Sequence, residues 1–462
     1  MSAPTTSRWL LPGLVLLNLV LKGLWLGVNE MAHDEPFTVY WSQRSLAELW
    51  AMMRTENNPP LYFLLIKGWS ALVPFETAWL RVPSAVFSAL TVWPLYLLAR
   101  SLSGTRAALT CCLLFTFTNY HYGFAHEVRA YSLFALLAVL GMWLIVRSKY
   151  KLHQGWNSAL ALALVDILLV YTHFFGWLLV GIQLLTVLFL PEFERQRRMV
   201  LTGLALCLLA YLPYAAIFLA RFGQSVSQGT WLEAPVPEEL YNMIWRWSNR
   251  PVLAVLFLVT ILVAAWRTKL SDLGLRLGLL WAFAPLLGMF MASFVAPIFL
   301  DRYLVYAAPG FALLVAASIS TAVPNERITV ALSVGACMGM LASFTPWQDT
   351  GLHPSRVVAQ AEAWCGQRCN LRVLPEWYWL NYNAAENIVY LRDPMPDHLP
   401  VDGSHARGEY VRGVPMSTVV VVDAGSSVQD PQRSWYQKLR ADHVTVDSIL
   451  ADHKVWVYRF QR

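Results

Sequence analysis

Two adjacent carboxylates follow a long apolar run near the start of the chain. The run covers residues 9–28, and His33, Asp34 and Glu35 come shortly after it. Neighbouring carboxylates raise each other's proton affinity, so such a pair can act as a general base with an orienting or metal-holding partner. The same residues can also begin a helix, because Asp is a common N-cap and Pro36 suits the first turn. Local spacing alone favours the helix cap.

A second group of polar residues places arginines at the ends of apolar runs. Glu127, Arg129 and Tyr131 lie at the start of one run, and Arg302 with Tyr303 precedes another. The planar guanidinium of Arg can bind a phosphate through two parallel hydrogen bonds while a nearby carboxylate positions it. In the competing interpretation, interfacial Arg and Tyr side chains only anchor helices at a membrane surface. Together, such arginines could bind the anionic headgroup of a molecule whose apolar tail stays in the lipid.

Further polar residues occur at similar positions. Arg81 begins an apolar run as Arg129 does, Asn58 belongs to the segment 57–60, and His173 ends another run. A packed, hydrogen-bonded imidazole explains His173 more simply than a ligand does. Asp166 lies deeper in the same run, where an ionisable residue is a functional candidate by default. Since a polar contact between helices is the competing explanation, Asp166 is left outside the predicted site.

Long apolar segments must position these residues. Of the 462 residues, 57% are hydrophobic and 14% are charged, whereas soluble domains carry roughly a quarter charged residues. This composition excludes a soluble multidomain protein. The net charge of +6 comes from scattered Lys and Arg and does not indicate a nucleic-acid partner. About eleven apolar runs resemble helices that cross a bilayer, near residues 9–28, 83–98, 107–119, 130–145, 159–172, 177–190, 200–219, 252–265, 273–295, 304–319 and 328–344.

Charged connections between these runs indicate their orientation. Lys and Arg are enriched on the cytoplasmic side of membrane proteins. Short basic connections alternate here with longer ones of mixed charge, and they lie at residues 100–106, 147–151, 195–198, 267–269 and 327. We therefore predict that the N-terminus is cytoplasmic. Because the first apolar run ends without a small-residue cleavage signature, we also expect that the first span is not cleaved. The apolar segment 61–73 is too short to cross, so we expect a helix at the interface.

The composition changes after residue 344. Apolar β-branched runs at 418–422, 444–449 and 455–460 predict strands of a soluble α/β segment. Cys365 and Cys369 are close enough in sequence for a short disulfide in an oxidising compartment, against the alternative of two free thiols.

The fold class follows from these observations. We predict a mainly α protein whose residues 1–345 form a polytopic transmembrane helical bundle of about eleven spans. The first outer loop covers residues 29–82. Residues 346–462 are predicted to form a small extracytoplasmic α/β domain.

The polar clusters, taken in order, resemble the GT-C glycosyltransferases. The resemblance is closest to the bacterial relatives of the protein O-mannosyltransferases and of the aminoarabinose transferases, and it covers roughly residues 10–345. No single cluster is specific, so the resemblance depends on the ordered set: Asp34-Glu35, Asn58-Pro-Pro-Leu-Tyr62, Leu80-Arg-Val-Pro-Ser84, His126-Glu-Val-Arg-Ala-Tyr-Ser132, Tyr171-Thr-His173, and Asp301-Arg-Tyr303 followed by Pro309.

This resemblance implies an enzyme of the plasma membrane, the inner membrane of a bacterium. It would transfer a sugar from a polyprenyl-phosphate donor to a lipid, glycan or protein acceptor at the outer face, with inversion. Asp34 corresponds to the catalytic aspartate of the family and has Glu35 beside it, so the resemblance favours catalysis over the helix cap. The residues then predicted to bind substrate are His33, Asn58, Arg81, Glu127, Arg129, Tyr131, His173, Arg302 and Tyr303.

Several alternatives stay open. The resemblance identifies neither the sugar nor the acceptor, and it implies no certain cofactor. Participation of a divalent metal is undecided because the first loop lacks a nearby Asp-x-Asp pattern. The main rival function is a transporter or flippase for a lipid or polyprenyl headgroup, although transporters usually carry their charge near the bilayer midplane on repeated, broken helices. A non-catalytic relative that serves as an assembly partner is disfavoured by the intact acidic pair and arginines.

Overall fold

The structure, a computed structural model, describes residues 8–31, 34–54, 58–150, 156–228, 232–346, 351, 353–365, 370–374, 389–390, 418–426, 432–452 and 455–461. The chain forms two compact units. The first comprises Met1–Leu26, Glu56–Tyr62 and Arg81–Trp347, and the second Gly27–Thr55, Phe63–Leu80 and Gln348–Arg462. His33, Cys369 and the side chain of Cys365 lie outside the described part, so the disulfide stays a prediction. The domain division expected at residue 345 also stays a prediction.

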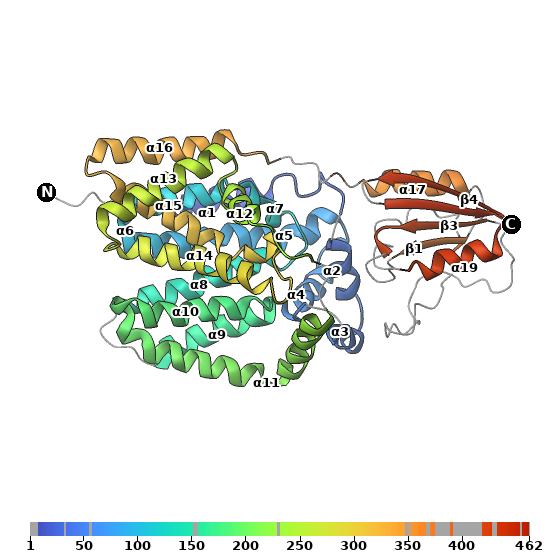
Figure 1. The fold of residues 1–462 in the computed structure, drawn as a ribbon, viewed down its shortest axis with the longest axis horizontal. Coiled ribbons are helices and arrows are strands. Elements are labelled where there is room, and N and C mark those ends of the chain that lie inside the picture. The colour runs from blue at the N-terminus through green and yellow to red at the C-terminus, as the bar shows by residue number, and fades with distance from the viewer. Residues whose placement is uncertain are drawn as a thin grey trace. The chain divides into compact units, whose positions relative to one another are not determined.

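Long helices make up the first unit, and Figure 1 shows many of them running side by side. Two short helices and two 3-10 turns connect them. The long helices are α1 (Leu10–Gly23), α5 (Thr77–Leu90, from Arg81 on), α6 (Val92–Thr116), α8 (Tyr131–Lys149), α9 (Trp156–Thr172), α10 (Gly176–Phe189), α11 (Arg197–Gln228), α13 (Pro251–Thr268), α14 (Leu273–Ala292), α15 (Ala308–Ala322) and α16 (Glu326–Ala342). The connecting elements are α7 (Asn119–Ala125), α12 (Glu238–Trp247), η1 (Pro191–Gln196) and η2 (Asp301–Leu304).

Each apolar run in the sequence lies largely within one or two of these helices. The runs at 83–98 and 107–119 are separated inside α6 by Gly104, which has φ +82 and therefore interrupts the helix. Glycine accepts this left-handed conformation at little steric cost. The helical interpretation of the runs is thus confirmed, whereas the number of membrane spans stays a prediction.

Helix α15 occupies the core of the first unit. It packs against α6, α13 and α14, and nearly all of its side chains are buried. Small residues allow this close approach: a Cβ added at Gly310 would lie 2.7 Å from Cγ of Trp281, and one added at Gly278 would lie 2.8 Å from Cα of Leu314. Small residues are common where membrane helices pack closely.

Several helices are long and apolar enough to cross a membrane. Among the described residues, five segments meet that criterion, at Thr77–Thr116, Tyr131–Lys149, Pro191–Ser227, Pro251–Thr268 and Leu273–Ala292. Shorter apolar helices lie at Leu10–Gly23, Trp156–Thr172, Gly176–Phe189 and Ala308–Ala322. The orientation of the termini stays a prediction.

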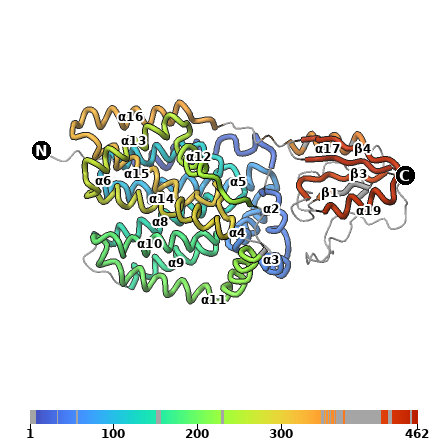
Figure 2. The backbone as a smooth tube through the Cα atoms, in the orientation of Figure 1, coloured from blue at the N-terminus to red at the C-terminus, as the bar shows by residue number. Residues whose placement is uncertain are grey.

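The second unit contains a five-stranded sheet in the order β2-β1-β3-β5-β4. Strand β1 is parallel to β2 and β3, whereas β5 is antiparallel to β3 and β4. Figure 2 traces the backbone of this sheet, in which β5 lies between β3 and β4. All three strands expected from the sequence are present. The elements are α17 (Pro354–Cys365), β1 (Asn370–Leu374), β2 (Val389–Tyr390), β3 (Thr418–Asp423), α19 (Ser434–Asp442), β4 (Thr445–Asp452) and β5 (Val455–Gln461).

Three short helices complete the second unit: α2 (Glu35–Ser42), α3 (Leu46–Met53) and most of α4 (Leu61–Ser70). The segment that was expected to form an interfacial helix is therefore helical. Lys67 of α4 donates to the backbone carbonyls of Arg44 at 2.6 Å and Ser42 at 3.4 Å, which satisfies carbonyls at the end of α2. Phe37 and Phe63 meet edge to face, with ring centroids 6.0 Å apart. These contacts fix α2, and with it the residues at its start.

Candidate active site

Arg129 lies in the tight turn that joins α7 to α8. Its side chain is buried, and Nη2 donates to Oδ1 of Asn58 at 3.3 Å. The guanidinium carbon also lies 5.7 Å from the ring centroid of Tyr131. On the backbone side, the Ser84 hydroxyl donates to the Arg129 carbonyl at 3.3 Å and shares a 2.6 Å hydrogen bond with Tyr62. Residues of α4, α5 and α8 thus meet at this arginine.

His173 lies in the connection between α9 and α10, within a set of aromatic rings. Its imidazole stacks on Phe134 with centroids 4.9 Å apart and planes 10° apart. The ring of Tyr303 lies 5.4 Å away and that of Tyr131 6.1 Å away. Nδ1 accepts a hydrogen bond from the backbone N–H of Phe175 at 3.2 Å. The proton of the neutral ring therefore belongs on Nε2, which makes that atom a hydrogen-bond donor.

The pKa of His173 shows that Arg129 and Arg302 lie near its imidazole. Burial, followed by the positive charges of Arg129 and Arg302, lowers the pKa of His173 to about 3. Charges perturb a pKa in this way only at short range. Arg129 and Arg302, which the sequence placed at the ends of two separate runs, therefore both lie near His173. The His173 imidazole is uncharged at neutral pH.

The 3-10 turn η2 carries Arg302 and is fixed by its neighbours. The Tyr120 hydroxyl donates to the backbone carbonyl of Asp301 at 2.5 Å, and burial raises the pKa of Tyr120 well above its usual range, so the donor stays protonated. The Asp301 carboxylate accepts from the backbone N–H of Arg302 at 2.7 Å and lies 3.3 Å from Nη1 of Arg246. Sequence reasoning missed Tyr120 and Arg246. Their positions at the ends of α7 and α12 become informative only once those helices meet η2.

Arg81 and Glu127 occupy neighbouring positions. The Arg81 guanidinium is buried and donates to the backbone carbonyl of Leu26 at 2.8 Å, and its charge contributes to the lowered pKa of His126. The half-buried Glu127 lies in the same turn as Arg129, whose N–H donates to the Glu127 carbonyl at 2.8 Å. A substrate role for both residues stays a prediction.

The acidic pair lies at the start of α2, in the second unit. Asp34 occupies the N-cap position, but its side chain makes no capping hydrogen bond. The helix-cap interpretation of Asp34 is therefore wrong. Glu35 is buried in the first turn. Whether the pair meets the arginines stays a prediction, as does a metal site: within the described ranges, no group of three or more His, Cys, Asp and Glu side chains could hold a metal ion.

Asp166 makes a polar contact between two helices, which was the structural explanation expected for this residue from the sequence. Its carboxylate accepts a 2.8 Å hydrogen bond from the amide of Gln183, which joins α9 to α10. Gly141 of α8 faces the same amide, and a Cβ at this position would lie 2.6 Å from Nε2 of Gln183. This position is structural, which agrees with leaving Asp166 outside the predicted site.

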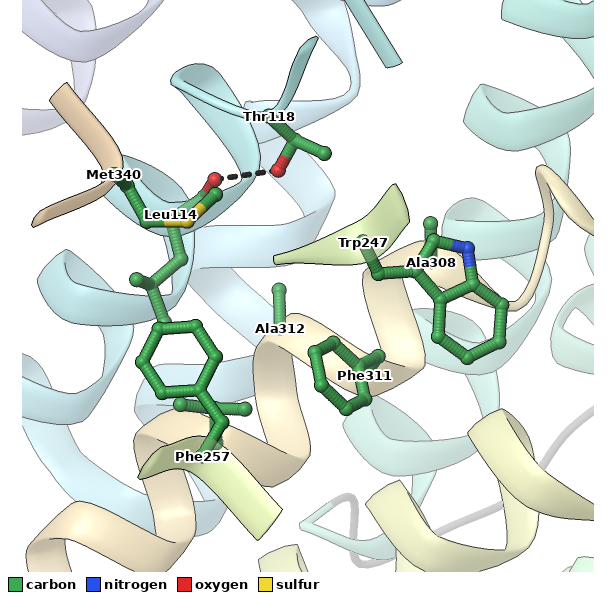
Figure 3. A pocket seen from close by; sticks show the side chains of 9 residues that line it. Leu114, Thr118, Trp247, Phe257, Ala308, Phe311, Ala312 and Met340 are labelled. Atoms are coloured by element: carbon green, nitrogen blue, oxygen red, sulfur yellow. Dashed lines mark hydrogen bonds between the residues drawn. The ribbon is translucent and has the colours of Figure 1, made fainter. Parts of the chain in front are cut away.

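A small apolar pocket, with a volume of about 10 Å³, lies elsewhere in the first unit, between α6, α13, α15 and α16 (Figure 3). Trp247, Phe257 and Phe311 form much of its wall. Its polar residue, Thr118, donates its hydroxyl to the Leu114 carbonyl at 2.7 Å. The pocket contains none of the predicted site residues, so the chemistry expected from the sequence does not belong there.

The fold is similar to that of solved membrane proteins. The chain superimposes on ArnT from Cupriavidus metallidurans bound to undecaprenyl phosphate with a TM-score of 0.64, covering 98% of each chain at 13% identity. The Archaeoglobus fulgidus oligosaccharyltransferase in complex with Zn and sulfate matches with a TM-score of 0.52, over 83% of this chain and 62% of its own, at 13% identity. The predicted resemblance is confirmed: this is the fold of the GT-C superfamily of membrane glycosyltransferases, mainly helical with several apolar helices.

A family model narrows the likeness further. Residues 57–217 match the model described as dolichyl-phosphate-mannose-protein mannosyltransferase. This stretch contains Asn58, Arg81, Arg129 and His173, but neither the acidic pair nor Arg302. The archaeal oligosaccharyltransferase AglB from A. fulgidus, in complex with an inhibitory peptide and a dolichol-phosphate, matches with a TM-score of 0.50 at 11% identity, over 81% of this chain and 63% of its own. No curated protein sequence matches the chain.

Proposed function

We propose that this protein is a membrane glycosyltransferase that takes a sugar from a polyprenyl-phosphate donor and transfers it to an acceptor at the outer face of the membrane, with inversion. One observation carries the proposal: Arg129 and Arg302 lie close to one neutral imidazole, that of His173, in a chain with the GT-C fold. Two guanidiniums at the ends of apolar helices suit a phosphate whose hydrocarbon tail stays in the bilayer.

Donor binding follows from the chemistry of these three side chains. Each guanidinium can donate two parallel hydrogen bonds to phosphate oxygens. The Nε2–H of His173 supplies a neutral donor near them, because Nδ1 is already occupied by the backbone of Phe175. The relatives ArnT and AglB were solved with undecaprenyl phosphate and a dolichol-phosphate, respectively. These ligands support a polyprenyl phosphate as the donor of this chain too.

The transfer step assigns roles to the acidic pair. The acceptor hydroxyl oxygen attacks the anomeric carbon, the bond from that carbon to the phosphate oxygen breaks, and its electron pair leaves with the phosphate. Asp34 takes the proton of the hydroxyl, and Glu35 orients Asp34. Arg129 and Arg302 stabilise the charge that develops on the departing phosphate. Asp34 lies at the start of α2, where its side chain makes no capping hydrogen bond.

The experiment measures sugar transfer in membranes that carry a polyprenyl-phosphate sugar pool, with mass spectrometry of lipids, glycans and proteins to find the product. Wild-type protein should form a glycosylated product, and Arg129→Ala should form far less at equal abundance. The rival flippase makes a different prediction, because it would move the lipid headgroup across the bilayer without making a glycosylated product. Headgroup movement without any sugar transfer would overturn the proposal.

A further inference from the structure

Asn249 lies in the turn between α12 and α13, and the proposed reaction assigns it no role. Its backbone has φ +61, a left-handed conformation that Asn adopts more readily than most residues do. Its carboxamide reaches the junction between α6 and α7. Nδ2 donates to the Phe117 carbonyl at 2.7 Å, and Oδ1 accepts from the Asn119 N–H at 2.8 Å. Phe117 follows the end of α6 and Asn119 begins α7, so one amide side chain satisfies two backbone groups that helix ends leave without an intrahelical partner.

The end of α16 is bonded to the same junction. Nδ2 of Asn119 donates to the Ser343 carbonyl at 3.0 Å, and its Oδ1 accepts from the Thr345 N–H at 2.8 Å. Nδ2 of Asn249 also lies 3.4 Å from the Met340 carbonyl oxygen and 3.4 Å from the Ser343 hydroxyl oxygen. The ends of α6, α7 and α16 and the turn between α12 and α13 therefore meet at two amide side chains.

Helices α7 and α12 are short, so their positions depend on such contacts. They have 7 and 10 residues, and helices shorter than about 12 residues are only marginally stable without tertiary packing. Each carries a side chain that holds Asp301 of η2. Tyr120, which follows Asn119 directly, donates to the Asp301 carbonyl at 2.5 Å. Arg246, in the last turn of α12 just before Asn249, lies 3.3 Å from the Asp301 carboxylate. The hydrogen bond between the two asparagines thus joins α7 to α12 beside both of these side chains.

We propose that Asn249 is a positioning residue of the donor site, which acts on Arg302 through α7 and α12. Its carboxamide holds the two helices together, so that Tyr120 and Arg246 reach Asp301 at the same time. Asp301 in turn accepts a hydrogen bond from the Arg302 N–H at 2.7 Å. The inference rests on the proposed role of Arg302 in binding the donor phosphate. In the competing interpretation, Asn249 only satisfies backbone groups at the junction, and its effect on the donor does not depend on Arg302.

A double-mutant cycle with Arg302→Ala separates the two interpretations. The readout is equilibrium binding of undecaprenyl phosphate to the purified full-length protein in nanodiscs. Asn249→Gly removes the carboxamide, and glycine accepts φ +61 at little steric cost. We expect this substitution to weaken donor binding about 2- to 10-fold, the effect of losing one hydrogen bond. In the Arg302→Ala background it should change the affinity less than about 2-fold, because the side chain that it positions is absent.

Asn325→Gly is the matched control. Asn325 precedes α16 at the end opposite Ser343, and its side chain accepts only from the backbone N–H groups of Arg327 and Ile328. The same change from asparagine to glycine should therefore leave donor affinity at the wild-type value in both backgrounds.

Two outcomes would overturn the positioning role while Arg302→Ala still weakens donor binding, so that the proposed function stands. The first is wild-type affinity in Asn249→Gly, and the second is an equal loss in both backgrounds. Wild-type affinity in Arg302→Ala itself would instead contradict the phosphate site of the proposed function, and the positioning role with it. Tyr120→Phe keeps the inference testable where Asn249→Gly does not fold, because it removes only the hydroxyl that donates to Asp301. It should show the same dependence on Arg302, and unchanged affinity in this variant also contradicts the inference.

Discussion

Arg302→Ala is the substitution that best separates phosphate binding from folding. Arg302 is only half-buried, and the contacts that hold η2 use the backbone and carboxylate of Asp301, which the substitution leaves in place. Losing a hydrogen bond to a charged group costs about 1.5–3 kcal/mol. We therefore expect about 10- to 150-fold weaker binding of a polyprenyl phosphate. Arg302→Lys should recover only part of this loss, because an ammonium lacks the planar fork.

The assay is equilibrium binding of undecaprenyl phosphate to the purified protein in nanodiscs at low and at physiological salt. Arg106→Ala is the matched control. Arg106 pairs with Glu326 at 2.7 Å in an exposed ion pair, and such pairs contribute about 0–1 kcal/mol, so donor affinity should not change. Wild-type affinity in the Arg302→Ala variant, with correct folding shown by an unchanged unfolding midpoint, would refute the assignment of Arg302 to the phosphate.

Three further predictions concern the base, the imidazole and the helix packing. Asp34→Asn should keep the protein folded and inserted but lower sugar transfer about 10²–10⁴-fold, since the amide cannot accept a proton; transfer near the wild-type rate would return the residue to a structural role. The pKa of His173, about 3, lies below its ordinary value near 6.5, so the stability gained from the neutral ring is complete above pH 6.5 and falls as the pH drops towards 3. Unfolding midpoints at pH 5–7 should show this loss in the wild type and not in His173→Phe. Gly141→Ala should destabilise the bundle by about 1–3 kcal/mol, because its Cβ would meet the Gln183 amide, and an unchanged midpoint would contradict this packing.

Polar residues inside the bundle show where sequence reasoning reached its limit. Lys22 is an ionisable residue in the apolar run at residues 9–28, which was a usable signal for a functional residue. The partners of that lysine could not be predicted in the same way, because Ser88 and Phe115 belong to other helices. Asp166 was recognised as an ionisable residue within a run, and its contact with Gln183 became visible only when α9 and α10 were packed together.

The sequence by itself determined the local structure. Apolar runs of membrane-crossing length predicted the helices, and β-branched runs predicted the strands β3, β4 and β5, since both depend on short stretches of chain. The same holds for Arg129 and Arg302, whose positions at the ends of apolar runs are visible without any contact between them.

Only the tertiary structure decided which of these residues meet. It brought Arg129 and Arg302 to His173, showed that Asp34 does not cap its helix, and buried Lys22 beside Ser88. The physical reason is that a membrane-spanning helix is apolar on most of its surface. Its sequence therefore does not predict which side of the helix packs against a neighbouring helix. Contacts between distant residues follow from the order and rotation of the packed helices, and those are properties of the whole bundle.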